Sequence, residues 1–263
     1  MTRCHFNSLL IPMLDYAMSD YILYYSPDSA NLIVRMALQE ADVAYEARLV
    51  DRSRGEQRSS EFLRLNPQGL LPVLVHRRAT THSNNGSVAD TVLFETAAIC
   101  LYLIDRHPLL GPGINHDGRG DLYRWLFYIS NTLHADLRIR FYAERYMGDR
   151  DAGHLRDMVS ERILGHLQLL DRHIAAHNGI WMLDSGFSAL DLYLGVCCRW
   201  LMLYPAGYPV AINQVSSNTH VWRLLTALEK RPAVARACNA EWIKAPFFIN
   251  PSRAEPAEGS VLG

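Results

Sequence analysis

Two neighbouring side chains, Glu95 and Thr96, stand directly before an apolar stretch of helical composition, residues 97–104. The first N–H groups of a helix have no partner within it, so together with the Thr96 hydroxyl they can bind a carboxylate. Glu95 can bind an ammonium group through a charge-assisted hydrogen bond. The pair can therefore bind charged groups, although a plain helix cap would use the same residues.

The elements that must position this pair alternate between strand and helix. Apolar, β-rich runs predict strands at residues 21–25, 45–50, 73–76 and 92–94. Helical spacing predicts helices at residues 32–41, 61–65 and 97–104. This order is typical of a βαβ-type domain. The polar residues 77–91 between the last two strands are predicted to lengthen a hairpin turn, so that residues 92–94 pair with residues 73–75.

The second half of the chain has a helical period throughout. Apolar residues three and four positions apart predict long helices over residues 121–145 and 155–177. Ser188 and Asp191 form an S-x-x-D cap before an apolar helix at residues 192–203. A final helix is expected at residues 221–230, ended by Pro232.

These patterns divide the chain into two folded domains with short flanking segments. The boundaries are an arm without a folded role, or a mis-assigned start, at residues 1–19, a first domain at 20–108, a linker at 109–118, an all-α domain at 119–250 and a flexible tail at 251–263.

Composition excludes several classes of protein. Hydrophobic residues make up 49% of the 263 residues and charged residues 20%, as in globular rather than disordered chains. A formal charge of −1 gives no basic field for nucleic acid. The most apolar stretch is too short for a membrane span, and the first 17 residues do not resemble a secretory signal.

The five cysteines include no C-x-x-C pair, and the histidines show no metal-site spacing. We therefore expect buried thiols, a reducing cytoplasm, and no bound metal, membrane or nucleic acid.

Three segments in order carry a family resemblance: YYSPDSANLIVRMALQEA (24–41), NPQGLLPVL (66–74) and LFETAAICLYL (93–103). Together they resemble cytosolic glutathione transferases, with features of the bacterial beta class and of the serine-type enzymes. Residues 125–146 and 187–194 of the helical half are also similar to that family. The resemblance implies a thioredoxin-like N-terminal domain that binds glutathione as co-substrate, an all-α C-terminal bundle that forms most of an electrophile pocket, and a homodimer.

The resemblance also implies roles for the glutathione-binding residues. Pro72 matches the family's cis-proline, which exposes the backbone of Leu71 to pair with the cysteinyl part of glutathione like an added strand. A trans proline that opens a strand is the alternative. Glu95 and Thr96 would then hold the γ-glutamyl ammonium and carboxylate.

The same comparison places the group that stabilises the glutathione thiolate after the first strand. The candidates share a hydroxyl or amide donor: Tyr24, Tyr25, Ser26, Ser29 and Asn31. Ser29 aligns with the family's catalytic serine and Asn31 is the second choice, while a plain N-cap role for Ser29 stays open. Ala30 stands where the beta class has cysteine. Asp28 replaces the usual glycine, and its charge would oppose a neighbouring thiolate.

His134 matches a histidine that beta-class enzymes place in the active-site cleft, although a packed helical histidine is the alternative. Tyr123, Phe127, Arg138 and Phe141 are candidates for the electrophile pocket, or else core residues.

The sequence thus predicts conjugation of glutathione to small hydrophobic electrophiles by thiolate stabilisation and proximity. Two alternatives remain. One is a glutathione-dependent reductase, dehalogenase, isomerase or ether-cleaving enzyme on the same scaffold. The other is a non-catalytic binding or interaction protein, because a fold does not settle activity.

Overall fold

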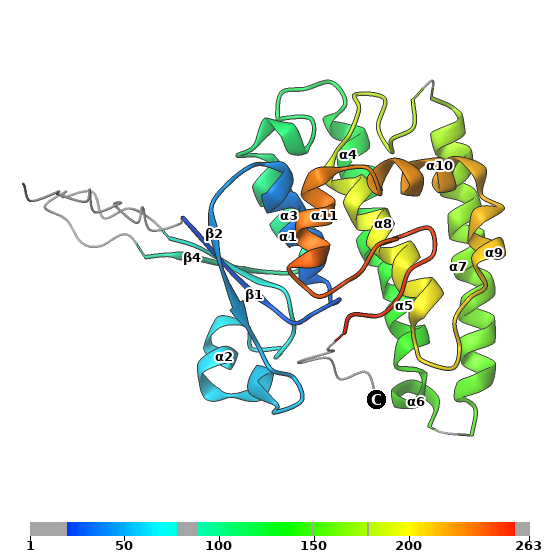
Figure 1. Ribbon diagram of the computed structural model, residues 1–263, viewed down its shortest axis with the longest axis horizontal. Coiled ribbons are helices and arrows are strands. Elements are labelled where there is room, and N and C mark those ends of the chain that lie inside the picture. The colour runs from blue at the N-terminus through cyan, green and yellow to red at the C-terminus, as the bar shows by residue number, and fades with distance from the viewer. Residues whose placement is uncertain (1–19, 78–88, 149, 178, 256–263) are drawn as a thin grey trace, which may run out of the picture.

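The computed structural model of the protein describes residues 20–77, 89–148, 150–177 and 179–255. Within these ranges a small sheet with its helices occupies one side of the molecule and a bundle of longer helices the other (Figure 1). The expected N-terminal arm, most of the polar segment 77–91 and the last eight residues of the expected tail lie outside the described residues.

The N-terminal sheet has four strands in the order β2-β1-β3-β4. Their bounds are β1 Tyr21–Tyr25, β2 Tyr45–Leu49, β3 Val73–His76 and β4 Thr91–Phe94. Strands β1 and β2 are parallel, which requires the helical crossover between them, and the other two pairings are antiparallel. Val73 pairs with Phe94 and Val75 with Val92, so the predicted hairpin is confirmed.

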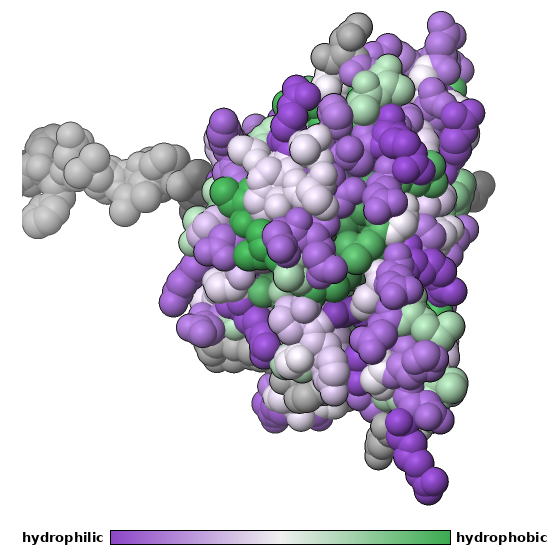
Figure 2. All heavy atoms as spheres, turned by 90° about the vertical axis from the view of Figure 1, so that its right-hand side faces the viewer, coloured by the Kyte–Doolittle hydropathy of each residue, from purple (hydrophilic) through white to green (hydrophobic). Residues whose placement is uncertain are grey.

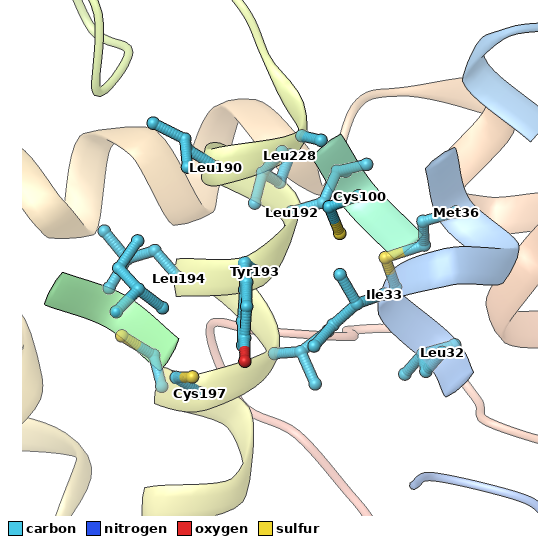
Figure 3. Close-up of a cluster of buried hydrophobic side chains, with 14 of the residues drawn as sticks. Leu32, Ile33, Met36, Cys100, Leu190, Leu192, Tyr193, Leu194, Cys197 and Leu228 are labelled. Atoms are coloured by element: carbon cyan, nitrogen blue, oxygen red, sulfur yellow. The ribbon is translucent and has the colours of Figure 1, made fainter. Parts of the chain in front are cut away.

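Two helices of this domain lie between the sheet and the bundle (Figure 1). They are α1 (Asn31–Glu40) and α3 (Thr96–Ile104), while the short α2 (Ser60–Leu65), preceded by the 3₁₀ turn Glu56–Arg58, lies apart from them. Figure 3 shows Ile33 and Met36 of α1 and Cys100 of α3 facing the next domain's Leu192 and Tyr193, and all five are almost fully buried. A shared core therefore holds the two domains together.

The C-terminal domain is a bundle of helices, as the sequence predicted. Its helices are α4 Arg119–Tyr128, α5 His134–Phe141, α6 Ala143–Met147, α7 Ala152–Ala175, α8 Ala189–Leu203, α9 Ile212–Ser216, α10 Thr219–Leu228 and α11 Pro232–Asn239. On the face shown in Figure 2, hydrophilic side chains predominate, with hydrophobic patches between them. Ser188 and Asp191 form the predicted capping box at the start of α8.

Two helical expectations and one about the tail need correction. The helix predicted over residues 121–145 is divided by a π-helical turn, Ile129–Leu133, and breaks again at Tyr142, where the backbone leaves helical angles (φ −109°, ψ 34°). Pro232 does not end the series of helices but begins α11, because proline fits the first turn, where its missing N–H costs nothing. The expected tail is packed as far as it is described: Arg199 donates to the carbonyl of Ser252 (2.6 Å), and Ala254 is buried.

The described cysteines are all free and buried. Burial raises the pKa of Cys100 and of Cys198 to about 12, so these thiols are protonated at neutral pH. The described residues hold no group of three His, Cys, Asp or Glu side chains placed to bind a metal ion. None of the helices in the described ranges is both long and apolar enough to cross a membrane.

Candidate active site

A cleft of about 1230 Å³ separates the sheet domain from the helical bundle. The N-terminal wall includes the turn after β1, parts of the segment from β2 to α2, the loop before β3 and the start of α3. The opposite wall includes residues of α4, α5, α6 and α8. The cleft brings together most of the site residues predicted from sequence: Ser29, Leu71, Pro72, Glu95, Thr96, Phe127, His134, Arg138 and Phe141. Asn31 and Tyr123 are not among its lining residues.

The start of α3 is open to the cleft. Thr96 is the first helical residue, and Glu95 before it has a positive φ of 70°. Glu95 makes no capping hydrogen bond to the helix, and within the described part of the chain its exposed carboxylate accepts one long bond, from Gln68 Nε2 (3.3 Å). The plain-cap alternative for Glu95 therefore does not describe this helix. A carboxylate and unpaired helix N–H groups lie side by side, as an α-amino acid group requires.

The loop before β3 has a defined shape. Asn66 donates to the Leu70 carbonyl (2.8 Å) and accepts from the Gln68 N–H (3.0 Å), which closes the turn. Gly69 has φ +65°, and an added Cβ would lie 2.9 Å from the Gln57 carbonyl oxygen. The Leu71–Pro72 peptide bond is cis, so the trans alternative is wrong. Both residues line the cleft.

Ser29 lies at the cleft wall, partly exposed, and its hydroxyl donates to Asn31 Oδ1. It does not cap α1, whose N-cap residue is Ala30 without a side-chain bond. Asn31 is fully buried, and its amide donates to Glu241 Oε1 (2.7 Å). Asn31 therefore does not face a ligand in the cleft, and its prediction as a thiol donor is wrong.

Asp28 occupies the left-handed position (φ 55°) where a glycine was expected. Its two carboxylate oxygens accept from Arg199, and one also accepts from the Tyr204 hydroxyl (2.6 Å). Its backbone N–H donates to Glu241 (2.9 Å). The charge expected to oppose a thiolate is thus paired with a buried guanidinium.

Sequence reasoning missed Glu241 as part of this turn. The Glu241 carboxylate also accepts from Arg35 Nε (2.8 Å). Burial, the largest effect, raises the pKa of Glu241 to about 7, while Arg35 acts in the opposite direction. No local pattern around residue 241 indicates that it reaches α1, more than 200 residues earlier in the chain.

His134 follows the π-helical turn and faces the cleft. Its Nδ1 lies 2.7 Å from the Tyr193 hydroxyl, and its ring centroid lies 5.2 Å from that of Trp200. Burial lowers the pKa of His134 to about 4, with a smaller contribution from the charge of Arg138, so the imidazole is neutral at pH 7. Thr96 also hydrogen-bonds Tyr193. A polar chain therefore runs from the start of α3 to the helical wall.

The remaining candidates for the electrophile pocket differ in whether they line the cleft. Tyr123 lies outside the cleft, where the Arg119 guanidinium is 4.8 Å from its ring centroid, so its predicted pocket role is wrong. Phe127 lines the cleft with half of its surface exposed. The sequence did not indicate several further lining residues: Arg52, Arg58, Tyr142, Arg145, Trp200 and Tyr204.

Comparisons with known proteins agree with this architecture. Residues 32–106 match the family model of the glutathione S-transferase N-terminal domain. Glutathione S-transferase GST-4.5 of Xanthomonas campestris is 29% identical over 186 residues, which cover 68% of this chain and 81% of that protein. The chain is therefore similar to glutathione S-transferases, by the family model over residues 32–106 and by the longer match over 68% of its length.

Two further relatives have names for different activities, one a glutathione transferase and the other a disulfide-bond oxidoreductase. A glutathione transferase structure from Burkholderia graminis, with two bound glutathione molecules per subunit, is 25% identical with a TM-score of 0.66, covering 84% of this chain and 88% of that one. The disulfide-bond oxidoreductase YfcG of Escherichia coli is 32% identical over 108 residues, 40% of this chain and 46% of that protein.

Proposed function

We propose that this protein is a glutathione transferase that conjugates glutathione to small electrophiles. The observation that carries the proposal is the meeting in one cleft of Glu95–Thr96, the cis Leu71–Pro72 segment and the Ser29 hydroxyl. Glu95 and Thr96 would bind the γ-glutamyl group of glutathione, and the Leu71 backbone would bind the cysteinyl backbone. The Ser29 hydroxyl would bind the sulfur. The relatives named glutathione S-transferase support the same assignment.

The chemistry follows from the acidity of the ligand's thiol. A free thiol with a pKa near 8.5 is only a few per cent thiolate at pH 7, and a hydrogen bond to the sulfur increases that fraction. Ser29 can supply the bond when its hydroxyl hydrogen turns from Asn31 toward the sulfur. The thiol proton leaves to solvent, a C–S bond forms, and the electrophile's leaving group departs with its electron pair.

Three further features belong to the proposal through the resemblance: a homodimer, a cytoplasmic location and a role in detoxification.

The paired Asp28 supports catalysis, because its charge is balanced by Arg199. The non-catalytic alternative is weaker for the same reason.

The test is calorimetric titration of glutathione into the wild-type protein and Ser29→Ala, with an ultraviolet difference spectrum for bound thiolate and an assay with 1-chloro-2,4-dinitrobenzene. Binding, a thiolate band that Ser29→Ala loses, and turnover are the expected results. Binding without turnover of any electrophile would favour a non-catalytic protein. No binding would reject the proposal.

A glutathione-dependent disulfide reductase is the second candidate, favoured by the likeness to YfcG. The cleft is lined by no cysteine among the described residues, so glutathione would have to supply both thiols. Reduction of 2-hydroxyethyl disulfide, coupled to NADPH through glutathione reductase, distinguishes it. Reductase turnover well above conjugation would make this candidate the better one.

A further inference from the structure

The electrophile side of the cleft is more cationic than a site for purely apolar compounds requires. Four arginines line the cleft: Arg52, Arg58, Arg138 and Arg145. Among the described residues, the acidic side chains of the lining are Asp28, which Arg199 pairs, and Glu95. None of the four arginines takes part in an ion pair among the residues that the structure describes.

Two of these arginines meet on one aromatic ring although they come from different domains. Arg52 Nη2 lies 3.5 Å from the Tyr142 hydroxyl, and the Arg145 guanidinium carbon lies 4.0 Å from the centre of the same ring. Two like charges gathered on one side chain repel each other, so this end of the cleft favours bound anions. Guanidinium groups bind carboxylates through two parallel hydrogen bonds, which suits such an anion.

Glutathione accounts for only part of this charge. Its γ-glutamyl carboxylate is assigned to the start of α3, and its glycyl carboxylate can use Arg52 or Arg58 of the N-terminal domain. Arg138 of α5 and Arg145 of α6 belong instead to the helical wall, whose lining also includes Leu137 and Phe141. The charge of Arg138 also acts on His134, one helical turn before it.

We propose that Arg138 and Arg145 form an anion subsite, so that the preferred second substrate is an electrophile with an apolar reactive part and a carboxylate. This inference rests on the proposed function. The apolar part would lie against Phe127 and Phe141, and the carboxylate would reach the two guanidinium groups.

The test compares 4-chloro-3-nitrobenzoate with the uncharged 4-chloro-3-nitrobenzamide. In both, the glutathione sulfur bonds to the ring carbon, chloride leaves with the C–Cl electron pair, and the thiol proton passes to solvent. Each kcat/KM is divided by the uncatalysed rate constant, which removes the difference in intrinsic reactivity. The wild type should prefer the benzoate, and Arg138→Gln/Arg145→Gln should reduce that preference by about tenfold or more, since charge-assisted bonds are lost.

The matched control is Arg64→Gln/Arg172→Gln, which removes two exposed arginines that do not line the cleft. It should keep the preference, and in the wild type added salt should lower the benzoate rate more than the benzamide rate. Equal preference in both double variants, or none in the wild type, would overturn the subsite.

Failure of the proposed function has a separate signature. If the wild type turns over neither compound, the transferase proposal fails, and calorimetric titration of the benzoate into protein saturated with S-methylglutathione, and into protein alone, decides the subsite. Benzoate binding that Arg138→Gln/Arg145→Gln abolishes and Arg64→Gln/Arg172→Gln retains would support the subsite. Absence of benzoate binding to the wild type would overturn the subsite.

Discussion

Asp28 and Arg199 form a buried, two-pronged ion pair that joins the two domains behind the proposed thiol site. Arg199 Nε lies 2.8 Å from Oδ1 and Nη2 lies 2.8 Å from Oδ2, with side chains 0% and 1% exposed for Arg199 and Asp28. Arg199 also donates to the carbonyls of Phe247 and Ser252. One side chain of α8 therefore fixes the turn that carries Ser29 and the C-terminal segment.

This geometry predicts a large stability loss for Asp28→Asn. Removing one charge leaves the buried Arg199 guanidinium without a counter-ion, which costs about 3–5 kcal/mol. The exposed pair Asp121–Arg124 offers the matched control, because its side chains are 51% and 68% exposed and Asp121→Asn should cost less than about 1 kcal/mol. Urea unfolding of both variants measures the difference, and equal losses would refute the assignment.

The sequence predicted the elements that depend on local pattern. The strand and helix periods, the Ser188 cap and the order of the three glutathione-site segments are all properties of short stretches, and the structure contains each of them. The π-helical turn and the break at Tyr142 could not be predicted, because they interrupt an otherwise regular helical spacing.

The inner part of the site was less predictable because it depends on distant partners. Asn31 has the right type and position for a thiol donor, yet Glu241 binds its amide from the other end of the chain. The charge of Asp28 was expected to oppose a neighbouring thiolate, but Arg199 of the other domain pairs with that charge. The sequence offered one signal of this pair. Arg199 interrupts an apolar helix, and a buried arginine requires a partner of opposite charge.

Glu95 is predicted to recognise the ammonium group of glutathione. Glu95→Gln removes the charge but keeps the side chain's shape, so affinity should fall about tenfold with the loss of a charge-assisted bond. Glutaryl-Cys-Gly, which lacks the ammonium group, should bind both proteins equally well. Calorimetry with both ligands forms a cycle that isolates this contact.

The control for Glu95 is Glu61→Gln, an exposed acid on α2 that does not line the cleft. It should leave both affinities unchanged. A loss of affinity for Glu95→Gln that is the same for both ligands would show that Glu95 shapes the start of α3 without contacting the ammonium group.

His134 is predicted to make stability depend on pH. Its pKa is about 4 when folded and about 6.5 when unfolded, so between these values the unfolded state binds more protons. The contribution is fully present above pH 6.5 and is lost as the pH falls through 4, about 3 kcal/mol in total by the linkage relation.

The measurement is the free energy of unfolding from pH 4 to pH 7. His134→Gln, whose amide can still bond Tyr193, should reduce the fall in stability toward acid pH, whereas the exposed His154→Gln should not. A wild-type slope that His134→Gln leaves unchanged would mean that folding does not lower the pKa of the imidazole.

Ser29 is predicted to act through the acidity of bound glutathione. Without its hydroxyl the thiol pKa should rise by about one unit, which corresponds to about 1.4 kcal/mol. At saturating glutathione, the kcat/KM of Ser29→Ala for the electrophile should therefore be about tenfold lower at pH 6.5 and approach the wild-type value near pH 9.5, where the thiol ionises without help. Ser53→Ala removes an exposed hydroxyl outside the cleft and should not change the profile. A loss of the same size at every pH would show that Ser29 positions the sulfur and does not stabilise its charge.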